Sequence, residues 1–368
     1  MFALLIPTGS DHDRSRVPVV TISLIAVNVA IYFVSNLLDS EAIARQFGFV
    51  AAHPLPHQFI THMFLHAGWP RGHEAEWTAY VNSALHVGGN MAYLWFAGSD
   101  LEDVFGAWKF LALYFLAGIS SAALFWLMAL LGENEFSNLS EPAVGASGAI
   151  SGLLGMYLVR FPRFKIRMWF AAMIPIPFIM RQGVTRISSI VFIGFWIGLQ
   201  IMFGVIALHA GGSQIAYWGH IGGFILGFVI GLLTQQWRHG QEEFWLKEAD
   251  HQFYKQKWYP AMEMYQRAAQ RYPRCSEAFT KWALCWECAG MPKRAEKVLY
   301  DALHIYEEHG WADEAAVVQQ ELQSLIGKAN VDVAARAKEK LAADATVPKY
   351  PNLMFRRDLD SRKGKRNV

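Results

Sequence analysis

Acidic residues are absent from one long stretch of this 368-residue chain: no Asp or Glu occurs between Glu141 and Glu242. Charged residues make up only 17% of the chain, and its other long apolar runs also lack acidic side chains. These runs therefore hold no carboxylate that would pass an ion along or take part in chemistry. The absence argues against an ion transporter and against a site built on carboxylates.

Cysteine is scarce as well, and Cys275, Cys285 and Cys288 all lie in the C-terminal third. Cys285 and Cys288 have the C-x-x-C spacing of zinc ligands, but no second cysteine pair or nearby histidine pair completes a set of four. We therefore expect no metal there. We interpret the three as helix cysteines that stay reduced in the cytoplasm.

Long apolar runs are what the chain has instead. The first, from Val17 to Leu38, has no charged residue, and about 20 apolar residues suffice for a helix to cross the hydrocarbon core of a bilayer. Five more candidates are 85–98, 110–131, 143–159, 187–208 and 215–233. We predict an all-α fold, with a cytoplasmic segment at 1–16 and a polytopic bundle of six transmembrane helices at 17–237. A signal peptide is the alternative for the first run, but no small-residue cleavage site follows it.

A further apolar piece, Phe164 to Met180, contains Pro175 and Pro177 and has arginines at its ends. Proline removes a helix hydrogen bond and clashes with the preceding turn. We therefore expect an interfacial or re-entrant segment here rather than another span.

Loop charges predict the orientation of the bundle, because Lys and Arg concentrate on the cytoplasmic side. The basic residues that fit one side are Arg14, Arg16, Lys109, Arg160, Arg163, Lys165, Arg167 and Arg238. The loops on the opposite side of the predicted bundle contain few Lys or Arg residues. Both termini are therefore predicted to be cytoplasmic, and Ser147 is predicted to lie about one helical turn below the outer face.

The fourth run contains the sequence GASGAISG at 145–152, which places the hydroxyl of Ser147 among glycines. Gly145, Gly148, Gly152 and Gly155 offer a face of small residues, which lets membrane helices approach closely. Packing is therefore one explanation of this motif, and a reactive serine is the other.

The sixth run carries His220, and an ionisable side chain within a membrane helix marks a functional site because it is costly without a partner. Gly219, Gly223 and Gly227 repeat every four residues around it, which is a GxxxG pattern. Docking the glycine faces of the fourth and sixth runs would bring Ser147 within hydrogen-bonding distance of His220. A serine beside a base is the arrangement of nucleophilic catalysis. With no carboxylate available, we predict a dyad.

Acyl transfer also needs donors for the developing oxyanion. His86 and Asn90 stand at i and i+4 in the second run, so they share one helix face, and both can donate hydrogen bonds. The alternative is a polar helix end that is satisfied by loop backbone.

Together these motifs resemble the rhomboid intramembrane serine proteases. The matching stretches are FLHAGW at 64–69, His86 with Asn90, Leu101-Glu102 with Gly106, GASGAISG at 145–152, Trp196 with Gln200, and GHIGGFILG at 219–227. They occur in the family's order over about residues 17–233.

The resemblance implies a role for each site residue. Ser147 would be the nucleophile and His220 the general base, and His86, Asn90 and the Ser147 backbone N–H would form the oxyanion hole. The supporting positions would be Gly145, Gly148, Gly219, Gly223 and Ser151.

The resemblance also implies a serine endopeptidase without a cofactor that cleaves single-span membrane proteins within or next to the span. We place it in the lipid bilayer of a bacterial inner membrane, with its active site open to the periplasmic face. A catalytically silent rhomboid-like scaffold is the alternative.

Two departures from the family pattern stand out. Residues Pro70 to Leu85 are inserted between the LHAGW motif and the helix of His86. Some members carry an aromatic residue one turn after the nucleophile, against which the histidine packs, whereas this chain has Ser151. Tyr217, Trp218 or Ser151 are the candidates for orienting His220.

Histidines crowd the first loop and suggest metal transport as a rival function, since imidazoles spaced by four on a helix can chelate. They are His53, His57, His62, His66 and His73. Because the spans contain no Asp, Glu or Cys to pass an ion along, ordinary loop polarity is the preferred interpretation.

The C-terminal part, 238–330, is charged and Ala-rich and repeats itself with a shift of 34 residues. The shift overlays Ala261 on Ala295, Tyr265 on Leu299 and Ala268 on Ala302. This resembles tetratricopeptide repeats, with two units and a further helix at 312–328. A generic pair of helical hairpins is the alternative. We expect a cytoplasmic protein or peptide partner to bind through 241–330.

Residues 331–368 form a basic tail that is predicted to be disordered. Anionic lipid would attract it. A solvated tail with no partner is the alternative, and no fold supports binding of nucleic acid.

Overall fold

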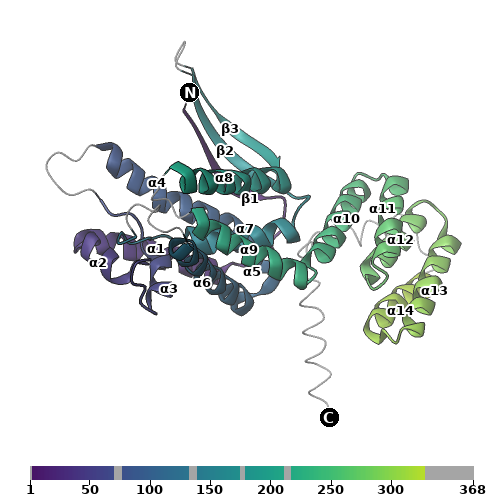
Figure 1. The fold of residues 1–368 in the computed structure, drawn as a ribbon. Helices are drawn as coiled ribbons and strands as arrows, with labels where there is room; N and C mark the ends of the chain where they lie inside the picture. Colours follow the sequence, from purple (N-terminus) through teal and green to yellow (C-terminus); the bar gives the residue numbers. More distant parts are fainter. Residues whose placement is uncertain (1, 70–76, 132–138, 175–178, 211–216, 328–368) are drawn as a thin grey trace. The chain divides into compact units, whose positions relative to one another are not determined.

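The computed structural model describes residues 2–69, 77–131, 139–174, 179–210 and 217–327 (Figure 1). The chain divides into two compact units, one of which ends at Trp237 while the other begins at Arg238. The predictions for the tail at 331–368 lie outside the described residues.

The first unit is built mainly from helices. In chain order they are α1 (Val19–Leu37), α2 (Ser40–Phe47), α3 (Gln58–Thr61), the 3₁₀-helix η1 (His62–Phe64), α4 (Trp77–Tyr93), the π-helix η2 (Leu94–Gly98), α5 (Ser99–Phe105), α6 (Ala107–Leu131), α7 (Ser147–Arg160), α8 (Ser189–Ala210) and α9 (Tyr217–Leu233).

Three helices of the described residues are long and apolar enough to cross a membrane: α1, α6 and the Ser189–Ile206 part of α8. A fourth would count if α9 and the helix after it formed one broken span. Helices α4, α7 and α9 are shorter. The count of six spans therefore stays a prediction.

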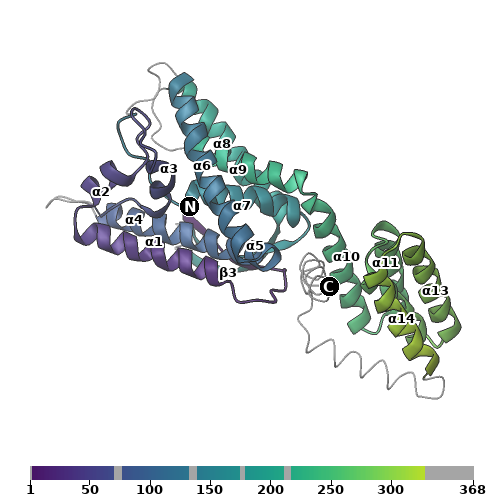
Figure 2. The same ribbon diagram turned by 90° about the horizontal axis from the view of Figure 1, so that it is seen from below.

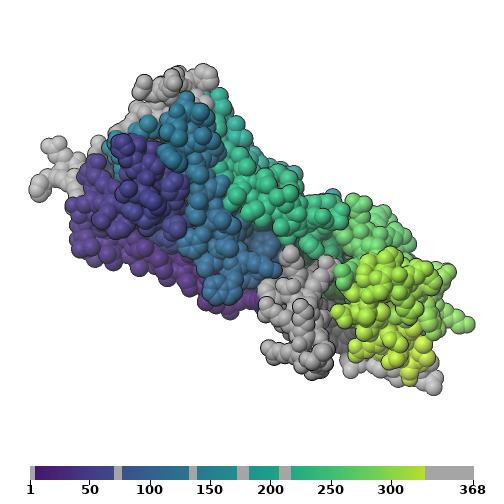
Figure 3. Space-filling view, turned by 60° about the horizontal axis from the view of Figure 1, so that its bottom comes forward, coloured from purple at the N-terminus to yellow at the C-terminus, as the bar shows by residue number. Residues whose placement is uncertain are grey.

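Large apolar side chains remain exposed on the long helices, as a surface facing lipid requires. Leu37 on α1 is 79% exposed, Leu116 on α6 is 51% exposed and Val191 on α8 is 61% exposed. Figure 3 shows α1 in purple and α6 in blue along the surface of this unit. The apolar helices and their exposed faces support an integral membrane protein.

Helices α7 and α9 meet through glycine. A Cβ added at Gly227 would lie 1.8 Å from the backbone oxygen of Gly152, and one at Gly223 would lie 2.0 Å from that of Gly148. A Cβ at Gly155 would meet Phe224 O at 2.2 Å. The two backbones therefore approach as closely as the GxxxG pattern predicts. Both views place α6 beside this pair (Figures 1 and 2).

A three-stranded antiparallel sheet is the element that the all-α prediction missed. It consists of β1 (Phe2–Ser10), β2 (Lys165–Ile174) and β3 (Ile179–Ser188) in the order β1-β2-β3. Ile166 and Met168 of β2 are fully buried, whereas Arg167 between them is exposed, which is the alternation of a strand with one buried face.

The sheet also bears on the prediction of an interfacial or re-entrant segment from Phe164 to Met180, because Lys165–Ile174 forms β2 and β3 begins at Ile179. Pro175 and Pro177 lie outside the described residues. Whether these strands touch the membrane surface stays a prediction.

The insertion at 70–85 adds helix to the span of His86. Residues 70–76 lie outside the described residues, but α4 begins at Trp77, eight residues before the predicted start at Leu85. Ser83 in the added turns donates to Ala67 O at 2.6 Å and lies 2.8 Å from the hydroxyl of Tyr32. These two bonds tie α4 to the FLHAGW segment and to α1.

Buried acidic side chains of α5 organise the N-terminal end of the unit. Glu102 is 6% exposed and accepts hydrogen bonds from Val20 N, Thr21 N and Thr21 Oγ1 at 2.7–2.8 Å. A carboxylate at a helix N-terminus satisfies free N–H groups and complements the positive end of the helix dipole. Glu102 therefore caps α1, whose own N-cap residue, Pro18, makes no side-chain cap bond.

Asp100 and Asp103 hold the segment that joins β1 to α1. Asp100 accepts from Ser10 Oγ at 2.6 Å and from Arg14 Nε at 2.7 Å, and His12 Nε2 lies 3.0 Å from Asp103 Oδ2. The hydroxyl of Tyr157 in α7 also donates to Asp100, at 3.0 Å. A buried carboxylate is costly unless it is paired and hydrogen-bonded, and these partners meet that requirement.

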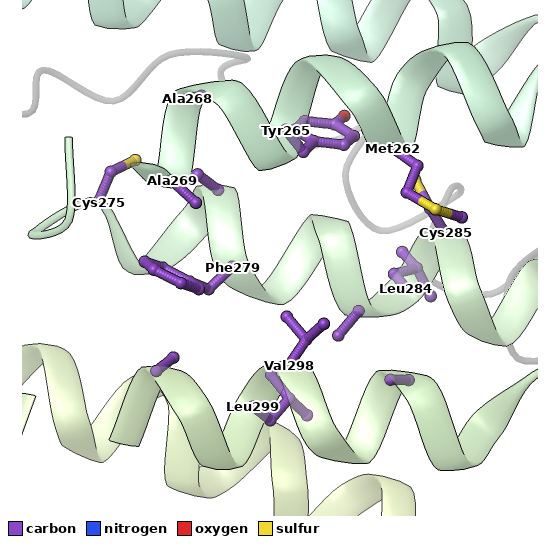
Figure 4. Close-up of a cluster of buried hydrophobic side chains, with 14 of the residues drawn as sticks. Met262, Tyr265, Ala268, Ala269, Cys275, Phe279, Leu284, Cys285, Val298 and Leu299 are labelled. Atoms are coloured by element: carbon purple, nitrogen blue, oxygen red, sulfur yellow. The ribbon is translucent and has the colours of Figure 1, made fainter. Parts of the chain in front are cut away.

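The second unit contains five helices among its described residues: α10 (Gln236–Tyr254), whose first two residues precede the boundary, α11 (Trp258–Arg271), α12 (Ser276–Cys288), α13 (Pro292–Glu308) and α14 (Ala312–Gly327). Tyr265 and Leu299, which the shift of 34 residues overlays, are both fully buried in one core with Cys285 (Figure 4). Ala261, Ala295, Ala268 and Ala302 are fully buried as well. The repeated positions therefore face the same core.

Gln256, between α10 and α11, has a left-handed backbone with φ 59°, and Gly290, which stands 34 residues later, has φ 77°. A residue with a Cβ costs roughly 1 kcal/mol in this conformation, whereas glycine does not. We expect Gln256→Gly to raise the unfolding free energy by ~0.5–1 kcal/mol. Denaturant unfolding followed by tryptophan fluorescence would measure the change.

Gln266→Gly provides the matched control, because Gln266 lies inside α11. Glycine inside a helix costs ~1 kcal/mol, so this variant should lose stability. A loss of stability in both variants would contradict the account of Gln256.

Candidate active site

Ser147 is the first residue of α7. The first N–H groups of a helix have no partner within the helix, and they lie at the positive end of its dipole. Before it, Gly145 has φ +134°, a conformation that L side chains rarely adopt, and its N–H donates to His62 O at 3.0 Å. Ser147 therefore lies beside the backbone N–H groups at the start of α7 that have no partner within the helix.

His220 of α9 reaches Ser147 directly, with its Nε2 atom 2.8 Å from Ser147 Oγ. The glycine contacts between α7 and α9 bring their backbones close enough for this bond. Both side chains are partly exposed. The structure thus places a hydroxyl within hydrogen-bonding distance of an imidazole, which is the geometry that activates a serine.

The second nitrogen of His220 meets a residue to which sequence reasoning gave no role. His220 Nδ1 lies 2.9 Å from Gln200 Oε1 of α8, and the Trp196 ring lies 6.1 Å from the imidazole, centroid to centroid. The sequence signal was the presence of Trp196 and Gln200 as a pair in the family motif.

Ser151, the candidate for orienting His220, instead donates to the backbone oxygen of Ser147 at 2.6 Å. Tyr217 stacks on Phe203, at 5.7 Å between ring centroids. Ser151 therefore bonds within its own helix, and the Tyr217 ring packs against Phe203 of α8. The expectation that a residue near Ser147 or beside His220 in the sequence holds the ring misses Gln200.

His86 of α4 also lies near Ser147. Its Nδ1 accepts the backbone N–H of Ala67 at 3.3 Å, so the neutral ring carries its proton on Nε2. A Cβ added at Gly145 would lie 3.2 Å from that Nε2 atom and 3.5 Å from Ser147 Oγ. His86 is thus a donor directed at the space that Gly145 leaves open.

Asn90 lies one turn further along α4 and is 8% exposed. Its Nδ2 donates to the backbone oxygen of His86 at 2.8 Å. This bond uses one of the two hydrogens of the side-chain amide.

A small cavity opens beside the Ser147–His220 pair. Most of its wall is apolar, and its polar side chains are His62, Ser121, Ser147 and His220. The remaining lining residues are Phe49, Ala122, Phe125, Ala143, Val144, Gly145, Gly148 and Gly219. His86 and Asn90 are not among the described residues that line it. A Cβ at Gly148 would lie 2.0 Å from Ser121 Oγ, so this glycine keeps α6 and α7 in contact.

Histidines of the first loop have hydrogen-bond partners inside the protein. His62 Nδ1 donates to Gln58 O at 2.8 Å, and His66 Nε2 lies 3.0 Å from Asn28 Oδ1. Burial lowers the pKa of His62 to about 4, and burial together with nearby His86 lowers that of His66 to about 3. Both are therefore neutral at pH 7. Among the described residues, no three His, Cys, Asp or Glu side chains are grouped to hold a metal ion; His73 lies outside them.

Residues 80–237 match the Rhomboid domain family. This stretch contains Ser147, His220, His86, Asn90 and Gln200. The match supports the rhomboid family for this part of the chain.

Three curated relatives agree with that match. Rhomboid protein 1, mitochondrial, from Saccharomyces cerevisiae is 25% identical over 57% of this chain and 51% of its own length. Rhomboid protease AarA from Providencia stuartii is 25% identical over 58% of this chain and 71% of its own length. Rhomboid protease GluP from Bacillus subtilis is 29% identical over 41% of this chain and 25% of its own length. The aligned part spans about half of the yeast relative. At the family level, these relatives support a rhomboid-type intramembrane protease.

Proposed function

We propose that this chain is a rhomboid intramembrane serine endopeptidase in which Ser147 is the nucleophile and His220 the base. The observation that carries the proposal is the 2.8 Å contact between His220 Nε2 and Ser147 Oγ. It joins two polar side chains from two apolar, glycine-packed helices, in a region that has no carboxylate. Helix packing alone gives no reason for that pairing.

The proposed reaction is acyl transfer in two steps. His220 Nε2 takes the proton of Ser147 Oγ as the oxygen attacks the scissile carbonyl, and the protonated imidazole then gives that proton to the leaving amine. In the second step a water molecule loses a proton to His220 and attacks the acyl-enzyme. Collapse of this second intermediate releases the carboxyl product and returns the proton to Ser147.

The negative oxygen of each tetrahedral intermediate would lie in the space beside Gly145. His86 Nε2–H and the free N–H of Ser147 at the start of α7 are the proposed donors, and the second amide hydrogen of Asn90 is the third. Donors that are fixed before the reaction stabilise such an oxygen most, because they need no reorganisation. Gly145 fits this role, since a side chain there would fill the site.

His86→Ala is expected to lower kcat by ~10²–10³-fold with little change in KM, because an oxyanion donor acts mainly in the transition state. Initial rates of substrate cleavage over a range of concentrations would measure both constants. His53→Ala is the control, since His53 is an exposed loop residue. This variant should cleave the substrate at the wild-type rate. Equal rates for the two variants would exclude His86 from the oxyanion hole.

The proposed substrates are single-span membrane proteins, cleaved within or next to the span. A helical segment shields its carbonyls in hydrogen bonds, so the scissile residues must first unwind. Glycine and proline weaken a helix by about 1 and 3 kcal/mol. We therefore propose that substrates carry such residues near the cleaved bond.

The topology also belongs to the proposal: six spans, both termini in the cytoplasm, and a site that opens to the outer face of a bacterial inner membrane. The loop charges support it. So does the position of Ser147 at the end of α7 opposite Arg160, which is a basic residue of the predicted cytoplasmic side.

For the second unit we propose tetratricopeptide-like repeats that bind a cytoplasmic protein or peptide. Burial of the residues that the shift of 34 overlays supports a repeat, and so does the left-handed backbone at both Gln256 and Gly290. Stacked helical repeats offer extended surfaces for partners.

Cleavage in proteoliposomes tests the catalytic proposal. The full chain would be reconstituted with a labelled single-span protein and, in parallel, treated with a fluorophosphonate that reports an activated serine. Cleavage in or near the span, with the label mapped to Ser147 by mass spectrometry, supports the proposal. Label on another serine would contradict Ser147 as nucleophile. No cleavage and no label would indicate the silent scaffold.

A further inference from the structure

The catalytic imidazole has a second partner whose chemistry decides which of its nitrogens is the base. His220 Nδ1 lies 2.9 Å from Gln200 Oε1, while Nε2 faces Ser147 Oγ. We propose that Gln200 is a positioning residue: its side-chain carbonyl accepts the Nδ1–H of His220 and holds the tautomer in which Nε2 is free to take a proton. The inference rests on the proposed function of the dyad.

The tautomer matters because a neutral imidazole carries a single proton. With that proton on Nδ1, Nε2 has a lone pair directed at the hydroxyl of Ser147 and can act as a base. With the proton on Nε2, the ring would donate to the serine and could not accept its proton. In serine proteases with a triad, an aspartate makes this choice, and changing it to asparagine lowers kcat by about 10⁴-fold.

An amide suits this position better than a carboxylate would. A carboxylate buried in an apolar bundle is destabilising unless it is paired. The amide carbonyl brings the acceptor and a dipole that favours the imidazolium, without a net charge. The stretch from residue 142 to 241 has no Asp or Glu, so no carboxylate of this stretch competes for Nδ1.

The ring of His220 is held from α8 on two sides. Trp196 stands one helical turn before Gln200, and its ring lies 6.1 Å from the imidazole at an angle of 39°. Ser151, one turn after Ser147, donates its hydroxyl to the backbone of its own helix and makes no bond to His220 among the described contacts. The contacts that position the His220 ring therefore come from Gln200 and Trp196 of α8.

The experiment compares Gln200→Glu and Gln200→Leu in the full chain, using cleavage of a labelled single-span protein in proteoliposomes. Leucine removes the acceptor, and glutamate keeps an acceptor but cannot donate. We expect Gln200→Leu to lose ~10²–10³-fold in kcat with KM within about twofold of wild type. Gln200→Glu should keep at least about a tenth of the wild-type kcat.

The pH profile separates positioning from a structural role. A carboxylate at residue 200 favours the imidazolium, so the acidic limb of the kcat profile should move to higher pH in Gln200→Glu. Among the described residues, Ser147 and His86 act on His220, and His62 lines the same cavity. All three are unchanged in these variants. Val191→Ala, at an exposed site of α8, is the control and should match wild type.

Two results would overturn the inference: a wild-type kcat and pH profile in Gln200→Leu, or a Gln200→Glu variant that is folded but as inactive as Gln200→Leu. Failure of the dyad itself gives a different pattern. In that case Ser147→Ala cleaves as well as wild type, or wild type neither cleaves nor reacts with fluorophosphonate, and the role of Gln200 fails with it.

Discussion

Cleavage is expected to fall by at least ~10³-fold in Ser147→Ala and by a similar factor in His220→Ala, because each variant removes one half of the proton transfer. The double variant should be no slower than the single ones, since the two residues act as a unit. Remaining activity would come from the oxyanion donors and substrate binding. Product formation from a labelled single-span substrate in proteoliposomes measures all three variants.

The control for this prediction is Ser23→Ala. Ser23 is an exposed serine of α1 whose hydroxyl donates to Val19 O, so its loss should leave the rate unchanged. Circular dichroism and thermal unfolding of each variant would show that the fold is intact. Multiplicative losses in the double variant, or wild-type rates in either single variant, would contradict a dyad.

The second large effect concerns stability, and we expect Gly227→Ala to destabilise the membrane unit by ~3 kcal/mol or more. An added Cβ would lie 1.8 Å from the backbone oxygen of Gly152, and a backbone atom cannot rotate away as a side chain can. Overpacking of a core by side chains alone costs typically ~1–3 kcal/mol. Separation of α7 from α9 would also lengthen the contact between Ser147 and His220.

Gly198→Ala on α8 is the matched control, because a Cβ there meets nothing within 4 Å. Alanine is the better helix former, so this variant should keep or gain up to ~1 kcal/mol. Unfolding in mixed detergent micelles, followed by circular dichroism, would rank the two variants. Equal losses would mean that glycine serves the helices by flexibility rather than by close packing.

Much of the arrangement around Ser147 follows from local patterns. Glycine every four residues beside a polar side chain is visible in both runs, and it predicts which helix faces meet. The structure places Ser147 and His220 2.8 Å apart, with His86 Nε2 directed at the same space. Catalytic roles for these residues remain the proposal that the variants above test.

The contact of Gln200 with His220 could not be predicted in the same way. Gln200 is one amide in an apolar helix, and only the packing of α8 on α9 brings it to His220 Nδ1. The buried carboxylates of α5 are similar, because Asp100 finds its partners at Ser10, Arg14 and Tyr157, all far from it in sequence.

The sheet was missed for a physical reason as well. β2 lies in an apolar segment, so its length and hydropathy suggested a membrane-associated piece. The alternation of buried and exposed side chains that marks a strand covers only a few residues of β2. Pairing of Phe2 with Met173 joins segments that no local pattern connects. The extra helix before His86 was missed because the residues from Trp77 to Ala84 are more polar than a membrane span.

The pairing of β1 with β2 also bears on how the chain is made. β1 comprises the first described residues, Phe2–Ser10, and its partner strand begins at Lys165. At a synthesis rate of ~5–20 residues per second, β1 waits roughly 10–30 s for the edge it will join. During that time an apolar strand with unpaired N–H and C=O groups is exposed to any chaperone or neighbouring chain. Correct pairing therefore requires Phe2–Ser10 to stay unpaired until β2 has been synthesised.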